Sequence, residues 1–154
     1  MSGVADLPDI EAIAAALFEK LEAVPGLVTS SRFLRHWNDV PNELRPALYQ
    51  AQQSGGTFSR NAGASSMMVV HLPFEVYIYV GPTADGAGTL PATLLNTIQQ
   101  GVMVALLTDL LHDGRQTLGG LVHDCFIDGE VETDEGTLGE QAVAIIPITA
   151  IAYY

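Results

Sequence analysis

The sequence is short of positive charge. Its 154 residues contain six Lys and Arg but eighteen Asp and Glu, which gives a formal net charge of −12 at pH 7. Six basic residues cannot form a broad surface that neutralises phosphates, so tight nucleic-acid binding is not expected. Charged residues make up only 16% of the chain and hydrophobic residues 48%. This balance indicates apolar surface that a partner covers, the alternative being an unusually aliphatic single core.

Cysteine and long apolar runs are also scarce. A single cysteine, Cys125, excludes an intramolecular disulfide. No run of about 20 apolar residues and no basic segment followed by an apolar one is present, so we expect neither a membrane span nor a signal peptide. No repeat, low-complexity stretch or linker divides the chain. The sequence therefore predicts one domain, residues 1–154, made in the reducing cytoplasm.

Two segments have the periodicity of helices. From Pro8 to Ala23, apolar residues recur at steps of three and four, so they share one face of a helix. A second helix is predicted from Pro91 to about Leu107 or Leu111. Because the second half of this segment is apolar nearly all round, we expect it to be buried on several sides, in a core or between subunits.

The remaining apolar segments have the pattern of strands. They are expected at Leu27–Leu34, Pro46–Gln50 and Ser66–Val80, followed by a C-terminal hairpin of Leu121–Thr133 and Gln141–Tyr153. Strict alternation along Ser66–Val80 places one apolar face on the core, and Pro73 indicates a bulge or an edge position there. The predicted fold class is α+β, a mostly antiparallel sheet of about four to five strands packed with two main helices.

The polar, glycine-rich stretch Gln52–Ser65 is predicted to be a long loop between two strands. It carries Phe58 and Arg60, residue types that often anchor interfaces. These two residues are candidate contacts with a neighbouring subunit or partner, while a solvated loop without a role is the alternative.

The predicted C-terminal hairpin carries most of the carboxylates of interest. Those that fall near its turn are Asp128, Glu130, Glu132, Asp134 and Glu135. Every second residue of this run is acidic, so a strand would place four carboxylates on one side. Such a row is either a solvated face or a functional negative surface. A calcium loop beginning at Asp124 is a weaker alternative, because Phe126 stands where the third ligand position requires oxygen.

No motif points to catalysis. His123 and Cys125 are two residues apart, so on a strand they would share one face, but a zinc site needs further ligands. The acidic surroundings disfavour a reactive thiolate at Cys125, and a small core residue is the simpler interpretation. No phosphate loop or nucleophile motif is present. We therefore predict no cofactor, no metal and no enzymatic activity.

Two stretches resemble a known family. Residues Ile10–Pro41 (IEAIAAALFEKLEAVPGLVTSSRFLRHWNDVP) and Gln116–Ile148 (QTLGGLVHDCFIDGEVETDEGTLGEQAVAIIPI) resemble the tail terminator proteins of long-tailed bacteriophages, also called tail completion or minor tail U-like proteins. The resemblance covers both ends of the chain and the order of elements between them. The Gln52–Ser65 loop and the last residues, Ala150–Tyr154, are not matched.

The resemblance implies a structural role in the virion. Such proteins form a six-membered ring on the last ring of the tail tube, stop its polymerisation and present a docking surface to the head-side connector. DNA passes through the ring without specific binding. Six copies at −12 each would formally carry −72, and a negative lumen would let a polyanion slide. The acidic run from Asp128 to Glu135 is accordingly expected on the lumen or on the outer rim of a hexamer.

Two rival functions remain open at this stage. A head-tail stopper or another neck or minor tail protein could have much the same sequence and would differ in what it docks to. A small cytoplasmic enzyme using acid catalysis would instead need a pocket around a carboxylate with a strongly shifted pKa.

Overall fold

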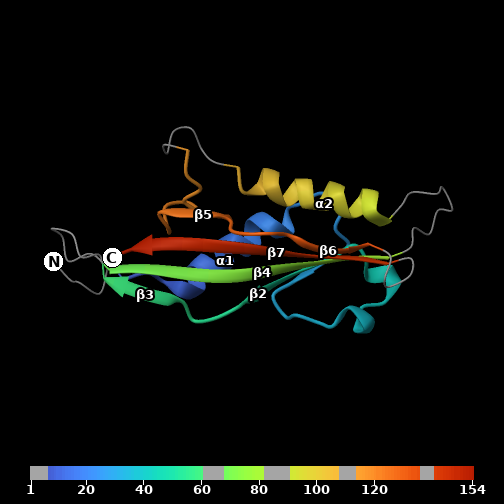
Figure 1. The fold of residues 1–154 in the computed structure, drawn as a ribbon, viewed down its shortest axis with the longest axis horizontal. Helices are drawn as coiled ribbons and strands as arrows, with labels where there is room; N and C mark the ends of the chain where they lie inside the picture. Colours follow the sequence, from blue (N-terminus) through green and yellow to red (C-terminus); the bar gives the residue numbers. More distant parts are fainter. Residues whose placement is uncertain (1–6, 61–67, 82–90, 108–113, 136–140) are drawn as a thin grey trace.

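The computed structural model describes residues 7–60, 68–81, 91–107, 114–135 and 141–154. One sheet of seven strands runs through the molecule, and two helices lie against it (Figure 1). The predicted class, α+β with a mostly antiparallel sheet and two helices, is confirmed, but the sheet has more strands than expected. The predicted loop after Gly81 lies outside the described residues. The second helix ends at Ala105, before its predicted end at about Leu107 or Leu111.

The elements follow each other in an order close to the predicted one. They are α1 (Ile10–Glu22), β1 (Thr29–Ser31), the short 3-10 helices η2 (Trp37–Asp39) and η3 (Asn42–Leu44), β2 (Ala47–Gln52), β3 (Thr57–Arg60), β4 (Met68–Val80), α2 (Pro91–Ala105), β5 (Asp124–Ile127), β6 (Glu132–Glu135) and β7 (Ala142–Tyr153). Neighbours in the sheet run β1-β2-β4-β7-β5, with β3 beside β4 and β6 beside β7. The β1–β2 pair is parallel and the other pairs are antiparallel.

The long strands β4 and β7 form the centre of the sheet and bury one face completely. Even-numbered residues from Val70 to Val80 and from Ala142 to Ala152 are buried under the helices. This confirms the core face predicted from the alternation of Ser66–Val80. Odd-numbered residues turn to the opposite side, which we call the outer face of the sheet.

The helices cover the inner face. Helix α2 packs on β4 and β7, and α1 packs on β2 and against α2. Helix α1 begins where the Asp9 carboxylate accepts a hydrogen bond of 3.0 Å from the Ala12 N–H, which caps its free donors. Ile13, Leu17 and Leu21 lie on its buried face, as their spacing predicted. In Figure 1 α1 crosses behind the strands, and α2 runs along the upper border of the sheet.

Pro73 lies in β4, which is an interior strand of the sheet. The predicted edge position is therefore wrong for the strand as a whole. Its partner changes, however, from β2 at Phe74 to β3 at His71. The Pro73 carbonyl accepts a hydrogen bond from the Gln53 N–H across this gap, and both backbone groups of a residue point to the same neighbour. Neither β2 nor β3 pairs with residue 73, so no strand partner needs the backbone N–H that proline lacks.

A smaller cluster covers one end of the outer face. Val40, Ala47, Tyr49 and Tyr79 are buried there, and Trp37 packs against them. Trp37 is half-buried, as a residue at the edge of a core would be. The segment that carries η2 and η3 folds over this end of the sheet. Within the described residues, no helix packs on the rest of the outer face.

The close approach of α2 to the end of α1 gives a first testable prediction. A Cβ on Gly101 would lie 2.6 Å from Val24 Cγ1, which is buried. Gly101→Ala should gain about 1 kcal/mol of helix propensity but lose about 2 kcal/mol to overpacking, a net loss near 1 kcal/mol. In a Val24→Ala background the same change should become stabilising. Urea denaturation of the four proteins measures this change of sign, and a stabilising Gly101→Ala in the natural background would contradict it.

Candidate functional site

The arm that carries the predicted acidic residues is not one strand. The expected strand Leu121–Thr133 is divided into β5 and β6, both paired with β7. Ile127 lies opposite Ile148 and Glu132 opposite Ile145, so residues 128–131 bulge out opposite residues 146–147. Gly129 lies in this interruption with a φ of 122°, a conformation that favours glycine. The Asp128-Gly129 pair is a turn signal that could have predicted the break.

The interruption nevertheless leaves three of the four carboxylates predicted for one side, Asp128, Glu132 and Asp134, on one face. The interruption adds two residues to this arm relative to β7. Because two is even, even-numbered residues point to the outer face both before and after it. Glu132 and Asp134 are in register with Ile145 and Val143, which are on the outer face. Asp128 joins them, because its Oδ2 accepts a hydrogen bond of 3.0 Å from the hydroxyl of the outer-face residue Thr149.

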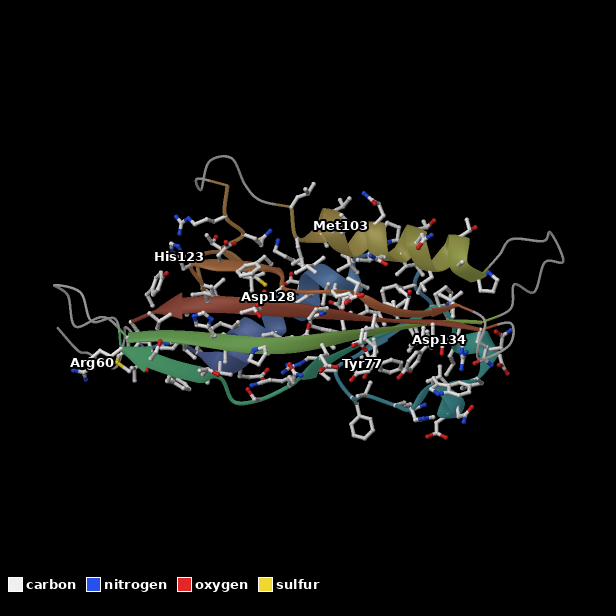
Figure 2. All side chains as sticks on the ribbon, in the orientation of Figure 1. Arg60, Tyr77, Met103, His123, Asp128 and Asp134 are labelled. Carbon is white, nitrogen blue, oxygen red and sulfur yellow. The ribbon has the colours of Figure 1, made fainter. Side chains whose placement is uncertain are left out.

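The other two predicted acids are placed differently. Glu130 is exposed within the interruption rather than on a strand. Glu135 is paired through its backbone with Ala142, and its side chain lies outside the described part of the chain. Figure 2 shows Asp128 near the middle of the sheet and Asp134 near the end where η2 and η3 lie. The acidic residues thus extend along the sheet instead of converging on one point.

A further carboxylate lies on the outer face of β4. Glu75 accepts hydrogen bonds from Gln53 Nε2 at 2.6 Å and from the Tyr77 hydroxyl at 2.7 Å. The bond to Glu75, together with burial, raises the pKa of Tyr77 to about 12. The Tyr77 hydroxyl therefore remains a donor at neutral pH and holds the carboxylate in place. Glu75 was not predicted as a member of this surface, although its odd position on the strand places it on the same face as Tyr77 and Tyr79.

The strands carry no Lys or Arg on this face. Among the residues of the seven strands, Arg60 alone is a Lys or Arg. Its register opposite Met68, with Phe58 opposite the core residue Val70, assigns it to the helix side. Arg115 borders the face through His123, and Arg45 lies under the segment that covers one end of it. Asp124 lies on the outer face opposite Ile151 and accepts hydrogen bonds from the Gln116 and Cys125 N–H groups. We call Glu75, Asp124, Asp128, Glu132 and Asp134 the acidic face.

Phe58 and Arg60 are not in a loop. They belong to β3, a four-residue strand within the stretch predicted to be irregular, so that prediction is wrong for Thr57–Arg60. Residues 61–65 of the predicted loop lie outside the described residues. Phe58 is 49% exposed and contacts Tyr154 edge to face, with ring centroids 6.5 Å apart. Both residues lie at the edge of the sheet, where an added strand or side chain could contact them.

His123 and Cys125 do not share a face. Cys125 points into the main core and is 1% exposed, and its burial raises the pKa of the thiol to about 12. His123 precedes β5 and stacks on Tyr153 of the outer face at 4.6 Å, while Arg115 contacts its Nδ1 at 2.8 Å. The predicted common face is wrong because β5 begins only at Asp124. Among the described residues, no three His, Cys, Asp or Glu side chains are grouped as metal ligands.

Exposed apolar side chains form a second set of candidate contacts. Met103, Val104 and Leu107 are 45%, 56% and 64% exposed, so the second half of α2 is not covered on all sides within this chain. Phe33 is the most exposed of the large apolar residues described, at 77%. Phe33 was not predicted as a contact, because Leu27–Leu34 was expected to be a strand, whereas β1 ends at Ser31.

Comparison with known proteins does not identify the chain. No protein-family model matches the sequence, and a search of curated proteins finds no match. Among the described residues, no helix is long and apolar enough to cross a membrane.

Proposed function

We propose that this protein is a structural component of a bacteriophage tail, a terminator that forms a ring on the end of the tail tube. The acidic face is the observation that supports this function most directly. Five carboxylates lie on one side of a sheet whose strands carry no Lys or Arg on that side. A ring that turned this face inward would repel the phosphates of DNA and let it pass.

The exposed apolar residues support assembly. Phe33 and the second half of α2 expose large apolar side chains on a chain with few charges. Such side chains are typical of surfaces buried in permanent complexes. One face of the ring would bind the tail tube protein and the other the head-side connector or stopper protein. Growth would end because the second face lacks the contacts that add another tube ring.

The length of the tails tests this function. A phage that lacks the gene should produce overlong tails that are not joined to filled heads, because nothing ends polymerisation. Negative-stain microscopy of the particles measures tail length, and a copy of the gene supplied in trans should restore it. Tails of normal length that fail to join heads would instead indicate a stopper or another neck protein. Normal infectious particles would contradict any structural role and reopen an enzymatic one.

A further inference from the structure

Lys20, in the last turn of α1, is a half-buried lysine. Among the residues that the structure describes, no carboxylate forms an ion pair or a hydrogen bond with it, although the chain has eighteen Asp and Glu. Burial and the charge of Asp124 raise the pKa of the Cys125 thiol to about 12, while the charge of Lys20 acts in the opposite direction. Because charges act over a short range, the ammonium lies on the side of α1 that faces β5.

Lys20 is in the wall of an open apolar pocket. The pocket has a volume of about 270 Å³ and lies between the end of α1 and the second half of α2. Ala23 and Val24 line it from the first helix, and Gly101 and Val104 from the second. Among the described residues that line it, Lys20 alone is charged. The pocket therefore combines an apolar wall with one positive charge that the chain itself does not neutralise there.

The size and the openness of this pocket favour side chains of a protein partner over a free small molecule. A volume of 270 Å³ holds about nine atoms the size of a water, which corresponds to two leucine side chains. Small-molecule sites usually have about 300–1,000 Å³ and bury at least about 70% of the ligand. Val104 is 56% exposed and Ala23 is also exposed, so the walls would leave a free ligand open to solvent. A protein partner would also cover Leu107, whose N–H donates to the Val104 carbonyl and whose side chain is 64% exposed.

A partner that covers the pocket must also supply a negative charge. Covering Lys20 removes water from its ammonium, and burying a charge without a counter-charge is strongly unfavourable. We propose that the α1–α2 pocket binds an acidic peptide segment of a protein partner, whose two adjacent apolar side chains enter the pocket while a neighbouring carboxylate pairs with Lys20. The net charge of −12 repels acidic peptides in general, so binding of one here would reflect the local charge. This inference goes beyond the proposed function and does not depend on the ring.

Two blocked peptides test the role of the charge. Acetyl-Gly-Asp-Leu-Leu-Gly-amide carries one carboxylate, and acetyl-Gly-Asn-Leu-Leu-Gly-amide has nearly the same shape without it. A chemical-shift titration of the Gly101 and Val104 amides should show that the unmodified chain binds the Asp peptide about tenfold more tightly. In Lys20→Met, which keeps an apolar side chain in the wall, the two peptides should bind equally and as weakly as the Asn peptide. Arg35→Met removes the same charge at an exposed position outside the pocket and should keep the tenfold preference.

A larger side chain in the wall tests the position of the site. Ala23→Leu should fill part of the pocket and weaken the binding of both peptides by at least about tenfold. Ala15→Leu makes the same change at an exposed position of α1 that does not line the pocket, and it should leave both affinities unchanged. Since both positions are exposed, neither variant should shift the unfolding transition, which separates loss of binding from loss of folding.

Three results would overturn the peptide site. They are equal binding of the two peptides by the unmodified chain, binding that Ala23→Leu leaves unchanged, and no binding at about 10 mM peptide. Decanoate, a free carboxylate with an apolar tail, serves as a further probe. If it shifted the same amides at a lower concentration than the Asp peptide, the pocket would be a small-molecule site, which would also overturn the proposal. Because these measurements use the isolated chain, they can fail while the tail-length experiment succeeds, and the reverse.

Discussion

Replacing Arg45 with methionine is expected to lower the free energy of unfolding by about 3 kcal/mol. Arg45 is only 8% exposed, although it carries a charge. Its Nε donates to the Val40 carbonyl at 3.0 Å, and its terminal nitrogens donate to the Trp37 carbonyl and, at 2.9 Å, to Gln141 Oε1. The Val40 carbonyl would lose its donor, and the Trp37 carbonyl would keep only the Val40 N–H, at 3.4 Å. A buried carbonyl without a donor costs about 1–3 kcal/mol.

The damage should be concentrated in the segment that carries η2 and η3. Methionine fills much of the same volume, so the apolar part of the small cluster should survive better than its hydrogen bonds. Trp37 is the single tryptophan of the chain, and its fluorescence reports on this segment. We expect its emission to shift to longer wavelength at denaturant concentrations below those that unfold the rest of the protein.

Two control variants make the measurement specific. Arg35→Met removes the same charge at an exposed position and should change stability by less than about 0.5 kcal/mol. Arg45→Lys keeps the charge but not the planar group that reaches three acceptors, so it should recover only part of the loss. Equal unfolding curves for Arg45→Met and the unmodified protein would show that these bonds do not stabilise the segment.

The sequence predicted those elements whose own residues determine them. Residues 68–80 alternate apolar and other side chains over a length that only a long strand explains, and β4 buries the predicted face. Helix α1 has its cap and its apolar stripe within one continuous segment. In both cases the pattern and the burial are properties of the same residues, so no knowledge of distant contacts was needed.

Strand β3 and the break between β5 and β6 could not be predicted from the pattern of their own residues. All four residues of Thr57–Arg60 are exposed, so no apolar pattern marks them, and only pairing with β4 makes them a strand. The break depends on β7, because Asp128–Val131 must leave the ladder while both flanking segments stay in register. The acidic face itself was partly predictable, since Asp128, Glu132 and Asp134 alternate along one segment. Glu75 belongs to β4, and it lies on the same face only because β4 and that segment both pair with β7.

Reversing charge on the acidic face is expected to make the protein hold DNA. Asp128 and Glu132 are exposed members of the acidic face. An Asp128→Lys, Glu132→Lys variant would put two lysines from every copy around the proposed channel. Because each neutralised phosphate releases counterions, affinity for duplex DNA should rise by at least about tenfold at low salt and fall steeply as salt increases.

The position of the reversed charges, not their number, should decide this result. Glu19→Lys, Glu22→Lys changes the net charge by the same amount at exposed positions of α1, on the helix side of the sheet, so it serves as the matched control. Fluorescence anisotropy of a labelled duplex across a salt series measures both variants on the assembled ring. A phage carrying the acidic-face variant should also release its DNA more slowly than one carrying the control. Equal DNA affinity and equal release for the two variants would mean that the acidic face does not line the path of the DNA, because charge near a polyanion acts within about 10 Å at ordinary ionic strength.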